Sequence, residues 1–544
     1  MKRILLLTLL LLLPFGCRKT VPDAAPFSGT DVGIPDAALL SARAEELRFR
    51  IERGELSATQ AKAKLDALSE AQTQLETAAA IARIRYCRDV TDAENRQAYG
   101  ALCGQLDALC GALAACRLLT EHPAEREQNA LLRTATLCDP AVRALFARER
   151  ELLFAYEALP LTLTVPYGGR QWNGNAILSD PTLPEADFAA LYETYMTLFH
   201  DRAADLYLEL VDVRNRIAAA CGCRTYAEYA CPDRMDAEAA AFSARVKAAF
   251  VPLLPKWTPD LLLAAGRLYG MTFPQEETLT AVGEAIADLL PELRIPWDGM
   301  LARDLYDLGP EETRYPLWFS ITLPSCGVPY LFGTWTGGSD MPAMLAHTFG
   351  QFASQFRNKD VNKFGNSFEC AEFRAAGLEL LLILRYDRLY GNMGPAAETA
   401  ELIFTVYTLA ALCAEDAFER FAYETPDLSE DALDAEYARL QDAYGLSPLT
   451  GDPRSWTQSA RLFESPLSGI GRAAGTAAAL ELYRIAKQDP CRAVSAYRSA
   501  LSEDPDAAFR DVLLRAGLPD PFAADTLKQT AYGLSIVRRD RKIE

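Results

Sequence analysis

Most of the chain carries apolar residues at the spacing of amphipathic helices. From about residue 35 to 159, glycine and proline are rare and leucines recur at helical intervals. Ser57 followed by Gln60 matches a capping box, which marks the start of one helix. The apolar face of that helix carries three leucines: Leu65, Leu68 and Leu75. Similar segments over about 92–120 and 127–156 predict a bundle of antiparallel helices, and the pattern is again helical from 184 to 220 and after 379.

Two segments have the pattern of β-strands instead. Residues 161–165 alternate strictly between apolar and polar side chains, turn formers occupy 166–174, and apolar residues follow at 176–178, which predicts a β-hairpin. Residues 316–338 are also rich in β-formers and predict two short strands joined by 324–328. The sequence therefore indicates a mainly α fold with a small sheet. We expect an exposed edge of that sheet to pair with an extended peptide.

The first 17 residues have the order of a bacterial lipoprotein signal. Lys2 and Arg3 precede an apolar run over 4–13, and Gly16 stands directly before Cys17. We expect a signal peptide over 1–16, a lipid on Cys17, and a flexible tether over 17–35 that is rich in Pro, Gly and Asp. The protein would then be an extracytoplasmic, membrane-anchored lipoprotein. Because residues 14 and 15 fit the usual cleavage box poorly, plain secretion and an uncleaved anchor stay open.

Composition and charge exclude some partners. The chain has 544 residues, 50% of them hydrophobic, and a formal net charge of −19. This length allows more than one domain, and we expect a helical region with the hairpin over 36–190 and a second domain over 191–544. The acidic balance argues against nucleic acid or an anionic bilayer as a partner of the folded part. The cysteines at 221, 223 and 231 lack a paired C-x-x-C half or a nearby histidine, which predicts structural thiols.

The candidate chemistry lies in residues 344–379. His347, Thr348 and Gln351 stand where a zinc peptidase would carry H-E-x-x-H on a helix. In that motif two histidines one turn apart bind the metal, and the glutamate polarises the metal-bound water. Glu372 and Glu379 follow on the next predicted helix. On its own, a single histidine in an apolar helix is more often a packed core residue than a ligand.

Several further motifs stand in order around this segment. R-x-x-I-A at 214–218 and T-Y-A-E-Y at 225–229 precede it, and G-V-P-Y at 327–330 leads into A-H-T-F-G at 346–350. A-E at 371–372 and W-x-x-x-x-R at 456–461 follow. In this order the motifs resemble those of the thimet oligopeptidase and oligoendopeptidase F family of zinc peptidases, most closely its oligoendopeptidase branch. The resemblance implies a helical bundle that encloses a deep cleft, with a small β-sheet beside the metal-site helix.

The resemblance also implies roles for individual positions. His347, Gln351 and Glu372 would be the metal ligands, and Thr348 would stand at the position of the general base. The segment that matches 456–475 donates hydrogen bonds to the substrate and the oxyanion in the family. In this chain the corresponding positions hold Arg461, Ser468, Ile470 and Arg472. A peptide would lie against six residues: Gly327, Tyr330, Gly333, Trp335, Arg461 and Arg472. The two arginines could hold a carboxylate by bidentate bonds.

The departures from the family pattern fall on the chemical positions. A threonine hydroxyl has no proton equilibrium near neutrality, so Thr348 cannot act as a base. A glutamine amide is a weak zinc ligand, which leaves only His347 and Glu372 as a poor two-ligand site. We therefore predict a catalytically inactive protein that binds a peptide or partner protein in its cleft, with no cofactor, or with zinc only if the residual site keeps some affinity. An active zinc peptidase with an unorthodox site and a purely structural scaffold are the alternatives.

Overall fold

The computed structural model describes residues 33–121, 125–179, 183–231, 236–310, 313–357, 367–502 and 507–539. The predicted signal peptide, Cys17 and most of the tether lie outside the described residues. The N-terminal helices are α1 (Ala37–Glu52), α2 (Ala58–Arg88), α3 (Ala93–Thr120), α4 (Glu125–Ala135) and α5 (Pro140–Thr162). The middle helices are α6 (Gly174–Ser179), α7 (Glu185–Ala220), α8 (Tyr226–Ala230), α9 (Asp236–Ala249), α10 (Leu254–Leu268), α11 (Gln275–Leu289) and α12 (Arg294–Ala302).

The remaining helices follow the sheet in the chain. They are α13 (Met341–Arg357), α14 (Phe368–Leu382), α15 (Tyr386–Tyr390), α16 (Gly394–Glu424), α17 (Glu430–Ala443), α18 (Ser447–Thr450), α19 (Ala460–Glu464), α20 (Gly469–Ala486), α21 (Pro490–Ser502), α22 (Phe509–Arg515) and α23 (Thr526–Arg539). A 3-10 helix, η8 (Pro453–Gln458), lies between α18 and α19. The predicted mainly α class is confirmed.

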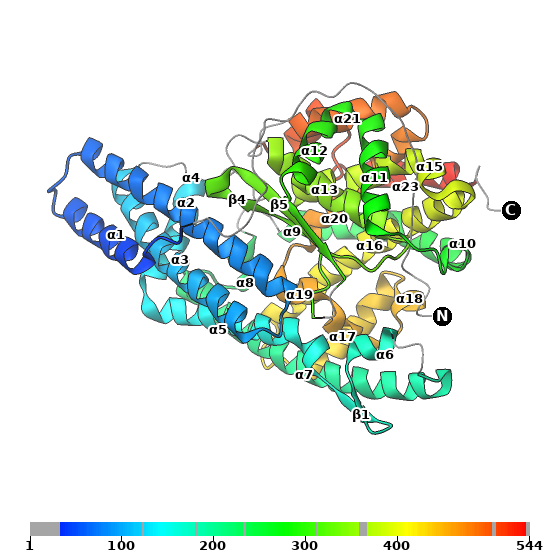
Figure 1. The fold of residues 1–544 in the computed structure, drawn as a ribbon, viewed down its shortest axis with the longest axis horizontal. Coiled ribbons are helices and arrows are strands. Elements are labelled where there is room, and N and C mark those ends of the chain that lie inside the picture. The colour runs from blue at the N-terminus through cyan, green and yellow to red at the C-terminus, as the bar shows by residue number, and fades with distance from the viewer. Residues whose placement is uncertain are drawn as a thin grey trace.

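Helices α1, α2 and α3 share a small hydrophobic core of their own and project to the left in Figure 1. The Ser57 hydroxyl accepts from the Gln60 amide N–H, and the Gln60 side chain accepts from the Ser57 N–H, so the predicted capping box is confirmed. The three predicted leucines of α2 are buried in this core: Leu65, Leu68 and Leu75. A second, much larger core includes side chains from α2 and α5 through to α23, on both sides of residue 190.

The predicted β-hairpin is present but is shorter and placed differently. Its strands are β1 (Val165–Tyr167) and β2 (Arg170–Trp172), which pair antiparallel around Gly168 and Gly169. Both glycines have positive φ, as a two-residue hairpin turn requires. The expected strand at 161–165 was wrong for its first half, since α5 continues to Thr162, and 176–178 belongs to α6. Alternation over five residues could not separate a strand from the end of a buried helix.

The small sheet has three strands rather than the two that the sequence predicts. Strand β3 (Tyr306–Gly309) pairs parallel with β5 (Val328–Thr334), and β4 (Phe319–Leu323) pairs antiparallel with the other side of β5. The order is therefore β3-β5-β4, and β5 is the central strand. The expectation that main chain near 327–335 offers a free edge to a peptide was wrong, because its hydrogen bonds are used on both sides. In this sheet the outer strands are β3 and β4.

Helices α13, α14 and α20 pack against one another behind the sheet and carry the candidate chemistry. Glycines permit the close approach of α14 to its neighbours. A Cβ at Gly350 of α13 would lie 2.4 Å from the Arg374 carbonyl oxygen, and one at Gly475 of α20 would lie 2.6 Å from the Glu369 carbonyl oxygen. Any larger residue would force these helices apart. The two glycines therefore fix the spacing between the side chains described below.

Two helical stretches are long and apolar enough to cross a membrane by length and composition, although the sequence was expected to contain none after the signal. They are Ala93–Thr120 and Phe368–Glu424. Both contribute to the cores described above, and the second is interrupted by short 3-10 turns. Core helices of water-exposed proteins meet the same criteria, so these stretches are weak support for a membrane span.

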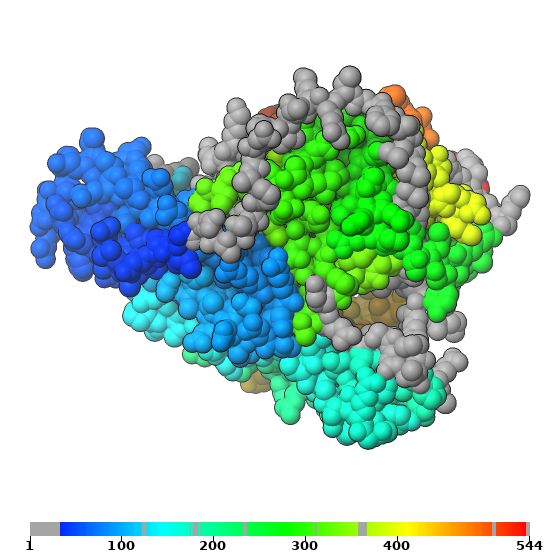
Figure 2. Space-filling model, in the orientation of Figure 1, coloured from blue at the N-terminus to red at the C-terminus, as the bar shows by residue number. Residues whose placement is uncertain are grey.

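The helices fall into two groups around a hollow. In Figure 1, α5 and α7 run along the lower side, while α11, α12, α13 and α21 form the upper part. Figure 2 shows a hollow between the upper, green part and the lower, cyan part, with gold-coloured chain at its base. This position agrees with the cleft that the family resemblance implies.

Candidate functional site

The structure brings His347 and both predicted glutamates together. His347 lies on α13, and Glu372 and Glu379 lie two turns apart on α14. The Nδ1 atom of His347 lies 2.7 Å from Oε2 of Glu379. Burial opposes the charged imidazolium, but the charges of Glu379 and then Glu372 outweigh it and raise the pKa of His347. The imidazole is therefore committed to an ion pair within the protein.

Behind this pair lies a group of buried acidic and phenolic side chains. Glu401 of α16 hydrogen-bonds Glu379, and burial together with the charge of Glu379 raises its pKa well above the usual value. Glu401 consequently keeps its proton and donates it to Glu379. Asp340 stands directly before α13, and burial raises its pKa to about 6. The sequence analysis singled out neither residue as functional, since Glu401 lies in a helical pattern without a motif.

Glu372, the predicted acidic metal ligand, is paired with an arginine. The Nη1 atom of Arg472, on α20, lies 3.2 Å from Oε2 of Glu372. Glu372 is 7% exposed and the Arg472 side chain 27% exposed, so the pair is mostly sheltered from water. Close packing of α20 on α14 at Gly475 brings the two side chains within reach. A guanidinium thus supplies the positive charge that a metal ion would otherwise give this carboxylate.

Arg461 is held in the same manner by a different glutamate. Its Nε and Nη2 atoms donate to the two oxygens of Glu415 at 2.9 and 3.0 Å, a bidentate pair. Ser459 also donates to Glu415, at 2.8 Å. The Arg461 side chain is 42% exposed, so its outer edge faces solvent. The sequence did not identify Glu415, which lies one residue before an acidic motif that was noted only as a resemblance.

The segment that carries Arg461 is anchored by Arg214, the first residue of the R-x-x-I-A motif. Its buried guanidinium donates to Glu149 at 2.7 Å and to the Tyr423 hydroxyl at 3.1 Å. It also donates to the carbonyl groups of Leu462 and Phe463, directly after Arg461. The motif therefore has a structural function here, because it fixes α19 against α7.

The other residues predicted at the site are turned to structural contacts. Thr348 is 1% exposed, and its hydroxyl donates to the Met344 carbonyl one turn earlier in α13, at 2.9 Å. Ser468 and Ile470 are buried at the start of α20. In the sheet, Trp335 donates to the Phe273 carbonyl and Tyr330 to the Tyr306 carbonyl. Their predicted role in substrate binding stays a prediction.

The two glycines predicted to line the peptide also have local structural roles. Gly327 joins β4 to β5 in a left-handed conformation, with φ of 64°, which favours glycine. A Cβ at Gly333 would lie 2.5 Å from the Trp318 ring, so only glycine lets that ring cover the strand.

These residues do not fit a zinc ion. A structural or catalytic zinc site needs three or four good donors that are free to bind it. Of the three predicted ligands, Gln351 offers only an amide, Glu372 is paired with Arg472, and the Nδ1 atom of His347 is paired with Glu379. The guanidinium also brings a positive charge close to any cation that would enter.

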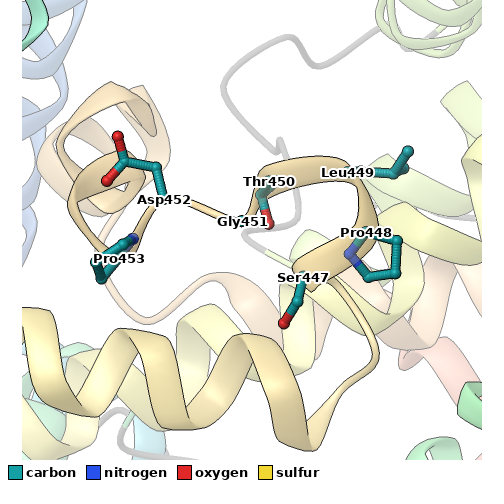
Figure 3. A pocket seen from close by; sticks show the side chains of 7 residues that line it. All are labelled: Ser447, Pro448, Leu449, Thr450, Gly451, Asp452 and Pro453. Atoms are coloured by element: carbon teal, nitrogen blue, oxygen red, sulfur yellow. The ribbon is translucent and has the colours of Figure 1, made fainter. Parts of the chain in front are cut away.

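One pocket of the described chain lies away from these residues in sequence. It is lined by seven consecutive residues, Ser447 to Pro453, which form α18 and the turn into η8 (Figure 3). A shallow hollow that a single turn forms has no convergent polar groups from different elements, so we do not assign it a ligand.

Known structures share this architecture over nearly the whole chain. A PZ peptidase A with an inhibitor superimposes with a TM-score of 0.81 at 16% identity, covering 95% of this chain and 100% of that one. A protein described as an oligoendopeptidase F has a TM-score of 0.79 at 18% identity, covering 95% of this chain and 99% of the other. The chain has the oligoendopeptidase F fold. A corresponding protein from Bacillus anthracis agrees, with a TM-score of 0.78, 15% identity, and coverage of 96% and 100%.

Sequence comparison alone gives no such likeness. No family model and no curated protein matches the chain. The oligoendopeptidase F fold is thus retained while identity to these structures is below 20%, and the resemblance read from the ordered motifs is confirmed for the fold.

Proposed function

We propose that this protein is a catalytically inactive relative of the oligoendopeptidases that binds peptides or a partner protein in its cleft. The observation that carries the proposal is the pair between Glu372 and Arg472, with Nη1 and Oε2 3.2 Å apart. A peptidase of this architecture would need that carboxylate for its metal. Here it is neutralised by the chain itself, the base position is a buried threonine, and the histidine is paired with Glu379.

Hydrolysis of internally quenched peptides tests the loss of activity. The purified protein is assayed with added zinc and, in parallel, after treatment with a chelator. We expect no turnover above that of buffer in either condition. Turnover that the chelator abolishes and zinc restores would overturn the proposal and favour the unorthodox peptidase.

The exposure of the paired side chains supports ligand binding. His347, Arg461 and Arg472 remain 25%, 42% and 27% exposed although helices surround them. A guanidinium has five N–H groups, and Arg461 uses two of its own on Glu415 while Arg472 uses one on Glu372. The remaining donors can accept peptide carbonyl or carboxylate oxygens.

A peptide library with fluorescence detection tests this binding. We expect Arg461→Ala to weaken bound peptides at least tenfold. Arg224→Ala is the matched control, because that side chain is 90% exposed and contacts only Glu228 by an ion pair. Equal losses in the two variants, or no binding of any peptide, would favour the structural scaffold.

We also propose that the protein is anchored outside the cytoplasm through a lipid on Cys17. The order of basic, apolar and small residues before that cysteine supports this. Expression with a radiolabelled fatty acid should label the wild-type protein and not Cys17→Ser, and the variant should leave the membrane fraction. Labelling of the variant, or its retention in membranes, would contradict lipidation at this position.

A further inference from the structure

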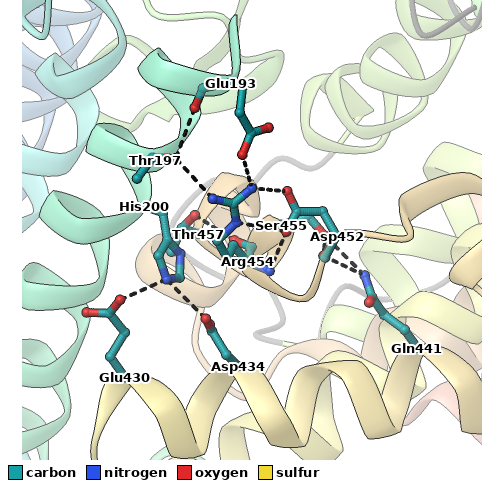
Figure 4. Close-up of polar contacts among 10 residues, drawn as sticks. All are labelled: Glu193, Thr197, His200, Glu430, Asp434, Gln441, Asp452, Arg454, Ser455 and Thr457. Carbon is teal, nitrogen blue, oxygen red and sulfur yellow. Dashed lines mark hydrogen bonds and ion pairs between the residues drawn. The ribbon is translucent and has the colours of Figure 1, made fainter. Parts of the chain in front are cut away.

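A second histidine lies in a cluster that the sequence did not reveal. His200 of α7 faces Glu430 and Asp434, which stand one turn apart on α17 and so share one face of that helix (Figure 4). The Nε2 atom of His200 lies 3.1 Å from Oε1 of Glu430 and 3.3 Å from Oδ2 of Asp434. More than 200 residues separate the imidazole from the carboxylates, so no local motif could indicate the cluster.

The geometry of the imidazole differs from that of an ordinary hydrogen-bonded pair. His200 is 2% exposed, yet neither of its ring nitrogens makes a hydrogen bond of normal geometry. The two carboxylate oxygens therefore lie near Nε2 without lying along its N–H direction. A cation bound on the axis of the nitrogen would place its oxygen ligands in such off-axis positions. In tetrahedral zinc sites with bonds of about 2.0–2.1 Å, ligand atoms lie roughly 3.3–3.4 Å apart, close to both distances seen here.

The charges of the cluster favour a cation. No arginine or lysine of the described chain forms an ion pair with Glu430 or Asp434, in contrast to Glu372 and Glu415. The neighbouring Arg454 is held by Asp452 and Glu193 and donates to Thr197, as Figure 4 shows. Two carboxylates thus share a single imidazole, and a divalent ion would balance their charge.

Further contacts orient the candidate ligands and leave one side open. The Trp456 indole N–H donates to Oδ1 of Asp434 at 2.7 Å, so the other oxygen of that carboxylate is aimed at His200. Such supporting bonds are usual around metal ligands. The Glu430 side chain is 40% exposed and that of Asp434 is 25% exposed, which gives an ion access and leaves space for a water ligand.

We propose that His200, Glu430 and Asp434 form a site for a divalent cation of the zinc type, separate from the peptidase-like residues. The ion would join α7, α17 and the start of η8, through Trp456, at the base of the segment that carries Arg461. A site with one nitrogen and two carboxylate oxygens, plus water, is typical of zinc. The role of this ion is structural.

The test is zinc binding to the whole protein after removal of metal with a chelator. Titration against a chromophoric zinc chelator should give one equivalent bound to the wild type. His200→Gln and Glu430→Gln should each weaken binding at least tenfold, and zinc should raise the melting temperature of the wild type but not of these variants. Glu430→Gln changes a partly exposed residue, so it keeps the test valid if His200→Gln folds poorly. Substitution with cobalt should add the visible absorption of a tetrahedral site to the wild type alone.

His347→Gln is the matched control and should leave zinc binding unchanged. No binding at micromolar zinc would overturn this site, as a purely protonated ion pair, and would leave the proposed function untouched. One equivalent that is lost in His347→Gln and kept in His200→Gln would overturn the site too. That last result would also count against the proposed inactivity.

Discussion

Two clusters of this protein each place one histidine beside glutamate or aspartate, and they differ in what else the carboxylates contact. Around His347, the chain supplies a basic partner for each surrounding carboxylate: Arg472 for Glu372, Arg461 for Glu415, and the histidine itself for Glu379. Around His200, two carboxylates share one imidazole and no arginine or lysine of the described chain pairs with them.

The difference teaches that ligand-type residues alone do not make a metal site. The cluster at His347 carries the recognisable motif position, but internal ion pairs have already satisfied its groups. The cluster at His200 lacks any motif, yet its groups are free to converge on an ion. Total zinc content therefore cannot decide whether this protein is a peptidase, because the metal could reside at either cluster. Each prediction below changes one cluster and leaves the other as a reference.

The largest expected effect comes from breaking the pair between Arg472 and Glu372. Arg472→Met leaves a nearly buried carboxylate without its partner, which should lower the free energy of unfolding by about 3 kcal/mol. Denaturant unfolding measures this. Arg472→Met combined with Glu372→Gln should recover most of the loss, since no unpaired charge remains. Arg224→Met, in an exposed pair, should cost less than about 1 kcal/mol, and an equal cost for both arginines would show that the buried pair is unimportant.

The next effect depends on pH and belongs to the acidic group behind His347. Burial raises the pKa of Asp340 to about 6, so the folded protein holds a proton that the unfolded chain releases near pH 4. The wild type accordingly loses stability as the pH rises from about 4 to above 6.

Asp340→Asn removes this ionisation and keeps the shape of the side chain. We expect the variant to be more stable than the wild type by about 2 kcal/mol at pH 8, and the difference to vanish near pH 4. Thermal unfolding at the two pH values tests this. A difference of the same size at both would mean that the carboxyl group does not titrate in this range.

The sequence predicted those features of both regions that depend on local patterns. It predicted the capping box at Ser57, the helix that carries His347 and the order of motifs around it. Partners that are far apart in the chain were out of reach: Arg472 is 100 residues from Glu372, and Glu430 is 230 from His200. Strand β3 was missed for the same reason, because its four residues become a strand only through parallel pairing with β5. That pairing also made β5 central, against the expectation of a free edge.

A smaller effect is expected on restoring the family motif at His347. Thr348→Glu with Gln351→His, in a His200→Gln background that removes the second cluster, should bind zinc weakly. Adding Arg472→Met should tighten that binding about tenfold, or about 1.4 kcal/mol, because the guanidinium no longer competes for Glu372. Zinc titration measures the change. Turnover of quenched peptides should stay poor, because Ser468 and Ile470 cannot replace the missing donors. Equal affinity with and without Arg472 would show that the ion pair does not exclude metal, and rapid turnover would show that the donor segment is adequate.

The smallest effect tests whether Thr348 retains any chemical role. Its hydroxyl donates only to the Met344 carbonyl, which is also the acceptor within the helix, so Thr348→Val removes a bond of minor value from a fully buried position. The free energy of unfolding should change by less than about 1 kcal/mol, and peptide binding and zinc affinity should equal those of the wild type. Thr348→Ser, which keeps the hydroxyl, is the control for the lost methyl group. A loss of peptide binding in Thr348→Val that Thr348→Ser avoids would place this hydroxyl in the binding site. The cluster at His347 would then retain a chemical function that its ion pairs conceal, and the contrast with His200 would have to rest on the metal alone.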